Sequence, residues 1–184
     1  MENSKILKLE KIILPVIIIA FGASLRLVPH PPNLAPIAAM ALFGGAYLNK
    51  KYALIAPLIA LFVSDIVIGF HSTMPFVYVS FILIGFIGLW LRKRRSSKWV
   101  LGATLSSSLL FFVITNFGVW ALGDLYPPTL DGLIRSYYLA LPFFRNTIIG
   151  DLIFVGLFFG SFELVLRLSQ RFVYGRENLY KDRR

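Results

Sequence analysis

The chain has 184 residues, of which 57% are hydrophobic and only 15% are charged, and its mean hydropathy is +0.73. A soluble domain of this length needs a more polar surface, so the composition excludes that class and indicates a single-domain membrane protein. The chain has no cysteine and only two histidines. Disulfides, thiolate metal sites and cysteine nucleophiles are therefore excluded, and we expect no metal and no cofactor.

Apolar runs separated by proline, glycine or basic clusters predict an all-α protein with six membrane-spanning helices. In chain order the runs cover residues 11–28, 34–48, 52–70, 75–91, 99–122 and 142–168, and residues 169–184 form a basic tail. In the short second run, Pro36 suits the first turn, and Gly44 and Gly45 allow close contact with another helix. Ala20-Phe21-Gly22 also fits a signal-peptidase site, and cleavage there would leave five spans.

The net charge of +10 is distributed unevenly along the chain. Nearly all lysines and arginines lie in the N-terminal segment, the second and fourth loops and the C-terminal tail, whereas Arg135 is the only one in the other loops. This is the positive-inside pattern, so both termini are expected in the cytoplasm. We therefore expect a multi-pass protein of the bacterial cytoplasmic membrane, surrounded by lipid and with no nucleic-acid partner.

With this orientation, most polar residues within the spans lie in the outer half of the membrane. A charged group at the bilayer centre costs about 2.5 to 3.5 kcal/mol, so buried carboxylates normally pair or line a wet cavity. Two interpretations of Asp65 and Asp151 stay open. Either Arg26 and Arg145 neutralise them and lock helices together, or these groups line a polar cavity that opens to the outside.

The fifth span carries a stripe of residues that recur every four positions: Thr104, Ser108, Phe112, Asn116 and Trp120. This spacing places them on one slowly drifting helix face. An amide beside a flat aromatic ring would suit a polar solute in a cavity. The alternative is an interhelical hydrogen bond by Asn116 and a position at the membrane interface for Trp120.

A short external amphipathic helix is predicted around residues 129–141, because the apolar residues of this segment recur on one helix face. Thr129 is the expected N-cap, Asp131 and Arg135 could pair on the opposite face, and Pro142 is the expected end of the helix. Such a helix would either rest in the interface or cover the cavity as a lid.

Motifs of common enzymes are absent from the sequence. It has no GxxxxGK[ST] loop, HExxH, GxSxG or kinase-type signature. Neither His30 nor His71 falls on a helix face with a serine partner. We therefore expect no enzymatic activity, and a small intramembrane enzyme ranks third among the functional alternatives.

Five segments carry a family resemblance: "PNLAPIAAMALFGGAYL", "SDIVIGFH", "TNFGVW", "YPPTLDGL" and "LPFFRNTIIGDLIF". From about Arg26 to Glu163 the chain resembles a family of small bacterial membrane proteins of unassigned function, often described as similar to S components of energy-coupling-factor transporters. The resemblance implies a six-helix, S-component-like fold that captures a vitamin or similar micronutrient from the outer side. It also implies docking on a transmembrane coupling protein driven by two ATPases.

The sequence thus predicts the substrate-binding membrane subunit of a micronutrient transporter, and the alternative is a non-transporting scaffold of the cell envelope. Asp65 and Asn116 would bond the polar edges of the solute, Trp120 would stack on it, and Arg145 would meet an anionic group or orient Asp151. The expected substrate-binding residues are Asp65, Asn116, Trp120, Arg145, Asn146 and Asp151, with Arg26, Asn33 and His71 near them.

An external energy source is expected because the sequence has no phosphate-binding loop and no chain of acidic residues through the membrane centre. The inner half offers only Glu163, which could pair with Arg167 one turn later. S components often dock through small residues spaced AxxxA. In this chain Ala35, Ala39, Ala41 and Gly45 have that spacing, and they form the expected partner-docking surface.

Overall fold

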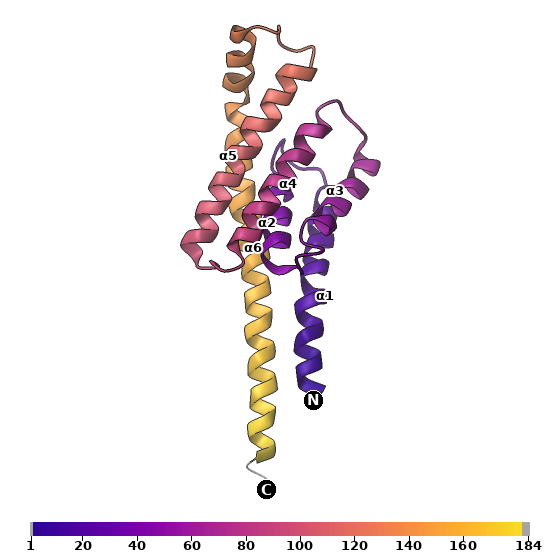
Figure 1. The fold of residues 1–184 in the computed structure, drawn as a ribbon, viewed down its shortest axis with the longest axis vertical. Coiled ribbons are helices and arrows are strands. Elements are labelled where there is room, and N and C mark those ends of the chain that lie inside the picture. Colours follow the sequence, from indigo (N-terminus) through magenta and orange to yellow (C-terminus); the bar gives the residue numbers. More distant parts are fainter. Residues whose placement is uncertain (1, 182–184) are drawn as a thin grey trace.

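The computed structural model describes residues 2–181, with side chains over residues 13–171. Every regular element in this part of the chain is a helix, as the apolar runs predicted. The six helices are α1 (Glu2–Leu25), α2 (Ile37–Tyr47), α3 (Ile55–Ile68), α4 (Met74–Leu91), α5 (Ser97–Leu122) and α6 (Leu130–Lys181) (Figure 1).

The short helix α2 is the centre of the bundle, because it contacts each of the other five helices. All of its residues from Ala38 to Ala46 are buried, as expected for a helix that is apolar on every side. Two arginines hold its C-terminal end. Arg92 Nε donates to the carbonyl oxygen of Gly45 over 2.9 Å, and Arg95 Nη2 donates to that of Ala46 over 3.0 Å. These bonds satisfy carbonyls that have no partner within the helix.

Glycines allow α2 to approach its neighbours closely. A Cβ atom on Gly45 would lie 2.5 Å from the carbonyl oxygen of Gly85 and 2.7 Å from the Cα atom of Gly88, both on α4. A Cβ atom on Gly44 would lie 2.5 Å from the side chain of Pro57 on α3. The close helix contact predicted for Gly44 and Gly45 is therefore confirmed.

Three helices are long and apolar enough to cross a membrane. They are α4, α5 and the part of α6 from Leu130 to Arg171. The remaining apolar stretches among the described residues, Ile13–Leu25, Ile37–Tyr47 and Ile55–Ile68, are shorter. At about 1.5 Å per residue, α2 extends over roughly 16 Å, about half the hydrocarbon core. The described residues thus form six helices, and three of them have the length and composition of membrane spans.

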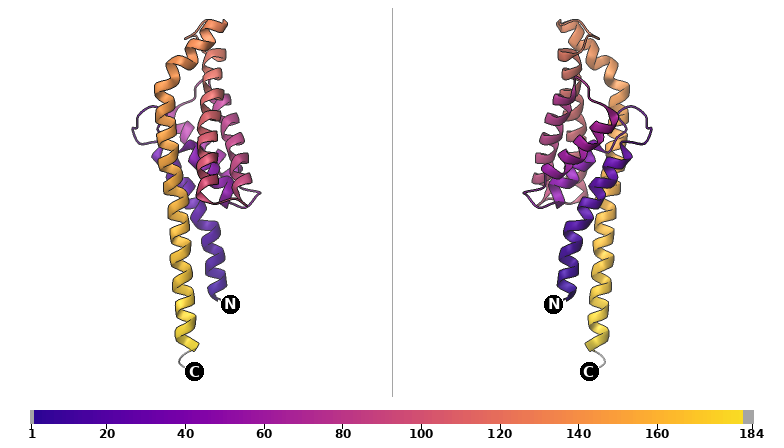
Figure 2. Two further views of the ribbon diagram at one scale, coloured as in Figure 1. Left: turned by 90° about the vertical axis from the view of Figure 1, so that its left-hand side faces the viewer. Right: turned by 90° about the vertical axis from the view of Figure 1, so that its right-hand side faces the viewer.

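Successive connections lie at opposite ends of the bundle (Figures 1 and 2). Residues 48–54 and 92–96 lie at the end from which α1 and α6 project with the two termini; this end is named the basic end. Residues 26–36, 69–73 and 123–129 lie toward the opposite end, named the far end. The lysines and arginines of the predicted cytoplasmic loops are therefore gathered at one end of the molecule.

The separate helix predicted over residues 129–141 is wrong, because α6 runs unbroken from Leu130 to Lys181 with Pro142 inside it. A proline in a helix removes one backbone donor and bends the axis, but neighbouring helices let a long apolar helix continue past it. Figure 2 shows the upper end of α6 leaning toward the top of α5. The predicted tail, 169–184, likewise begins inside α6, and its side chains beyond residue 171 lie outside the described residues.

Two local predictions at the start of α6 are confirmed. The hydroxyl of Thr129 accepts a hydrogen bond from the backbone N–H of Gly132 over 3.2 Å, which is an N-cap interaction. Arg135 Nε lies 2.9 Å from Asp131 Oδ2 on the exposed face of the helix.

Candidate functional site

A cavity of about 460 Å³ lies at the far end of the bundle and is named the far cavity. Its size falls within the range of about 300 to 1,000 Å³ that is typical of small-molecule sites. Four of the predicted substrate-binding residues line it: Arg26, Asn33, His71 and Asn116. They come from the α1–α2 connection, the α3–α4 connection and α5, so the fold brings together residues that are far apart in the sequence.

Arg26 and Asp65 form a buried ion pair beside the far cavity, which confirms their predicted pairing. Arg26 Nη2 lies 2.9 Å from Asp65 Oδ1, and the two side chains are 10% and 3% exposed. The hydroxyl of Tyr78 donates to the other carboxylate oxygen over 2.8 Å. Arg26 also donates to the hydroxyl of Ser64. Because Asp65 balances the guanidinium charge, Arg26 does not present an unpaired charge to the far cavity.

The amide of Asn116 bonds within its own helix. Its Nδ2 donates to the carbonyl oxygen of Phe112 over 2.8 Å, so the expected alternative of an interhelical hydrogen bond is wrong. Among the described residues no donor reaches the amide oxygen, which stays free to accept a bond in the far cavity. Asn116 is therefore tolerated in the apolar helix, because a backbone carbonyl oxygen one turn earlier accepts a hydrogen bond from its side-chain N–H.

Trp120 does not line the far cavity, although it follows Asn116 on the same stripe. Its indole N–H donates to the carbonyl oxygen of Pro127 over 3.1 Å, and its ring packs on Phe117 at 5.5 Å between ring centres. The far cavity does not supply the stacking position expected for Trp120, so its stacking on a solute stays a prediction. Positions four residues apart shift gradually around the helix axis. Trp120 therefore contacts the α5–α6 connection, residues 123–129.

Asp151 lies in a small adjoining cavity of about 30 Å³. Its Oδ2 accepts a hydrogen bond from Ser108 over 2.6 Å. Asn33, Ile37 and Phe111 line both cavities, so Asp151 is separated from the far cavity by a shared wall.

Arg145 is exposed and forms no ion pair with Asp151 among the described residues, so its expected role in neutralising or orienting that carboxylate is wrong. Six residues of helix turn the two side chains about 120° apart around the axis. Arg145 also does not line the far cavity.

Asn146 holds the α1–α2 connection, residues 26–36, against α6. Its Nδ2 donates to the carbonyl oxygen of Pro32 over 3.1 Å. The next residue, Asn33, adopts φ of 62°, a left-handed conformation that asparagine tolerates better than most residues. Asn146 therefore positions the loop that carries Asn33 to the cavity wall and does not itself line the far cavity.

The expected docking surface on α2 is also wrong, because α2 is the core helix. Ala39, Ala41 and Gly45 are buried against other helices, and half-buried Ala35 lines the small cavity. The small residues of α2 that are spaced for helix contact therefore pack within the chain and not on its surface.

Sequence reasoning missed several polar residues of the far cavity: Thr73, Thr115, Tyr126 and Ser136. The position of Thr115 beside Asn116 was an available signal. The separate surface helix predicted over residues 129–141 does not indicate that Ser136 faces a cavity. The apolar walls include Phe111, Val119 and Phe143. In the part of the chain with described side chains, no three His, Asp or Glu residues are grouped to hold a metal ion.

The chain belongs to a family of unknown function, DUF6580, whose model matches residues 7–173. The resemblance to an uncharacterised family is therefore confirmed, whereas nothing links that family to S components. No curated protein and no solved structure matches the chain.

Proposed function

We propose that this protein binds a small polar solute in the far cavity. The observation that supports the proposal is the convergence of Arg26, Asn33, His71 and Asn116 on one cavity of about 460 Å³. Apolar walls with a few converging polar groups are typical of small-molecule sites.

The lining favours an uncharged, vitamin-like solute with several polar edges. The charge of Arg26 is balanced by Asp65. Hydroxyl, amide and imidazole groups make up most of the remaining polar lining. A charged solute would enter this site without a free counterion, which costs desolvation energy, whereas a neutral one would exchange water hydrogen bonds for protein ones.

We further propose that the basic end is cytoplasmic and that the far cavity opens to the outside of the cytoplasmic membrane. The segregation of basic residues supports this N-in, C-in orientation with six helices in the membrane. Cysteines can be introduced singly because the chain has none. On intact cells an impermeant thiol reagent should label Asp124→Cys, in the far-end connection, and not Ser96→Cys. The reverse pattern would overturn the orientation.

A role as the binding subunit of an uptake transporter is part of this proposal and rests on the sequence. The chain has no phosphate-binding loop, so accumulation of a solute requires a partner complex with ATPase subunits. Since α2 is buried, a coupling protein would contact the lipid-facing sides of the peripheral helices.

A thermal-shift screen of vitamins and their precursors on the purified protein tests the solute proposal. At least one compound should raise the melting temperature of the wild type and of Arg145→Gln, an exposed control outside the cavity. Asn116→Leu, which fills the cavity with an apolar side chain, should lose most of that shift. If no compound stabilises the protein, a scaffold role is favoured. If Asn116→Leu responds like the wild type, the solute binds outside the far cavity.

A further inference from the structure

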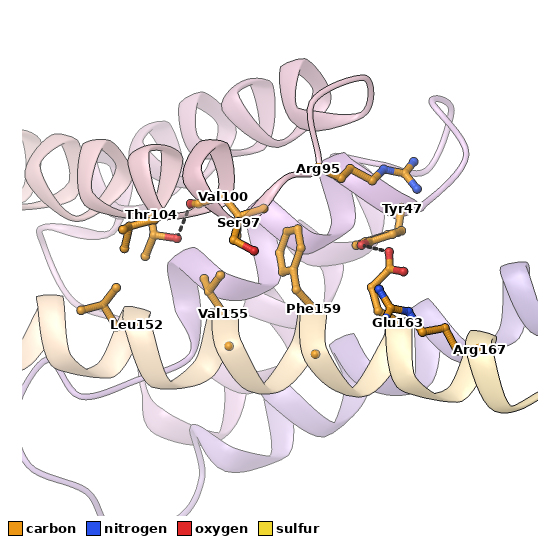
Figure 3. Close-up of a pocket in the computed structure, with 13 residues that line it drawn as sticks. Tyr47, Arg95, Ser97, Val100, Thr104, Leu152, Val155, Phe159, Glu163 and Arg167 are labelled. Carbon is orange, nitrogen blue, oxygen red and sulfur yellow. Dashed lines mark hydrogen bonds between the residues drawn. The ribbon is translucent and has the colours of Figure 1, made fainter.

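A second cavity, of about 590 Å³, lies at the basic end and is named the basic-end cavity. It is bounded by the end of α2, the first turns of α5 and the middle of α6 (Figure 3). It shares no lining residue with the far cavity, and none of the predicted substrate-binding residues lines it. An inference about it is therefore independent of the proposed solute.

The wall of this cavity changes from apolar to charged along α6. Figure 3 shows Leu152, Val155 and Phe159 in order along the helix, followed by Glu163 and Arg167. Between the apolar side chains, Gly156 and Gly160 leave the floor open, since a Cβ atom at either glycine would meet no atom within 4 Å. The cavity is thus an apolar trough that ends in charged groups at the basic end.

The charged end is organised by Tyr47, the last residue of α2. Its hydroxyl donates to Glu163 Oε1 over 2.7 Å, and the guanidinium carbon of Arg95 lies 4.4 Å from the centre of its ring. Arg95 is also fixed by its hydrogen bond to the carbonyl oxygen of Ala46. One tyrosine therefore holds a cation and an anion in place before any ligand arrives.

Arg167 lies one helical turn after Glu163, but the pairing expected between them is wrong, because no ion pair joins the two side chains among the described residues. The guanidinium groups of Arg95 and Arg167 and the carboxylate of Glu163 all border the basic-end cavity. Within residues 13–171, whose side chains are described, no carboxylate pairs with Arg167, so its guanidinium can bind an anionic group.

We propose that the basic-end cavity binds one phospholipid whose headgroup carries both a phosphate and a primary ammonium group. The phosphate lies between Arg95 and Arg167, because guanidinium groups bind phosphate oxygens with charge-assisted hydrogen bonds. The ammonium donates to Glu163, and an acyl chain follows the apolar trough over Gly156 and Gly160. Basic pockets between membrane helices on the cytoplasmic side bind the phosphates of lipid headgroups.

The carboxylate decides the class of lipid. A purely anionic headgroup would place its negative charge close to Glu163 and would offer that carboxylate no cation. An aminophospholipid offers a cation to Glu163 and an anion to the two arginines. A partner helix would also fit over Gly156 and Gly160. It would have to supply matching charges at one end, however, and a single aminophospholipid carries both charges in one headgroup.

The first test uses the purified protein in detergent with three phospholipids of identical acyl chains. Phosphatidylethanolamine should raise the melting temperature most. Phosphatidylcholine shares the phosphate but has no N–H to donate, and phosphatidylglycerol has no ammonium, so both should give clearly smaller shifts. Equal shifts for all three would overturn the proposal, because they would indicate solvation by lipid without a headgroup site.

Four variants locate the effect. Glu163→Gln should reduce the phosphatidylethanolamine shift to the phosphatidylcholine value, and Arg167→Gln should reduce the shifts for all three lipids. Gly160→Leu should block the trough and abolish the preference for phosphatidylethanolamine. Gly102→Leu is the matched control, since Gly102 lies outside this cavity and a Cβ atom there also meets nothing within 4 Å; it should keep the preference.

Two further outcomes would contradict the proposal. An increased response of Glu163→Gln to phosphatidylglycerol, with that lipid already the best stabiliser of the wild type, would indicate an anionic-lipid site. A wild-type dimer that Gly160→Leu converts to monomer, with no change in the lipid shifts, would show that a second copy of the chain fills the trough.

Discussion

Arg26, just after α1, and Asp65, on α3, form an ion pair that is 2.9 Å long and almost fully shielded from solvent. The pair fastens two peripheral helices together and places a guanidinium group in the wall of the far cavity. Because the charge is neutralised where it meets the cavity, the same contact contributes to stability and sets the electrostatics of the candidate site.

Asp65→Asn should destabilise the protein, because it leaves Arg26 charged and without its carboxylate partner. Breaking a buried pair in this way costs about 3 to 5 kcal/mol, and the lower end applies here since Arg26 borders a cavity. Equilibrium unfolding in mixed micelles measures the change. Asp131→Asn is the matched control: its pair with Arg135 is about 70% exposed, so its loss should cost less than about 1 kcal/mol. Equal losses in the two variants would contradict a structural role for the buried pair.

Gly45→Ala should disrupt the contact between α2 and α4. The added methyl group would meet the backbone of Gly85 and Gly88 at less than 3 Å, and backbone atoms cannot move aside as a flexible side chain can. We expect a loss of about 1 to 3 kcal/mol in unfolding free energy. Gly102→Ala, where the new group meets no atom within 4 Å, should be neutral or stabilising by up to about 1 kcal/mol through helix propensity. An unchanged stability of Gly45→Ala would mean that the helices are farther apart than described.

Asn116→Ala and Trp120→Phe should separate solute binding from loop stability. Asn116 bonds only its own helix, so its loss should change stability little, by about 0.6 kcal/mol or less, while reducing the shift caused by a stabilising compound from the vitamin screen. Trp120→Phe loses the bond to Pro127 and should increase hydrogen exchange in residues 123–129 with the compound's shift retained. Loss of the shift in Trp120→Phe alone would return the site to the predicted aromatic stripe.

The sequence predicted the features that follow directly from a short local pattern. Apolar runs predicted the helices, the contact glycines of α2 predicted close packing, and charge balance predicted the Arg26–Asp65 pair. These features depend on local composition or on the requirement that a buried charge has an opposite partner. They can therefore be recognised in a single sequence.

The remaining features depend on how the helices are rotated and packed, which periodicity does not determine. The predicted docking residues of α2 lie in the core, because α2 is buried on all sides. The turn of α6 separated Arg145 from Asp151, and drift along α5 carried Trp120 past the cavity. No sequence pattern indicates the basic-end cavity, because Tyr47, Arg95 and Glu163 come from three separate segments that only the fold brings together.

Asn116 lines a polar cavity that, as we propose, is reached from outside the cell. The most direct measurement is the labelling of Asn116→Cys, in an otherwise cysteine-free chain, by a small charged methanethiosulfonate reagent added to intact cells. We expect labelling without permeabilisation, whereas Ser96→Cys should be labelled only after the membrane is opened. Labelling of Asn116→Cys only after permeabilisation, or no labelling at all, would contradict an outward polar cavity at this residue.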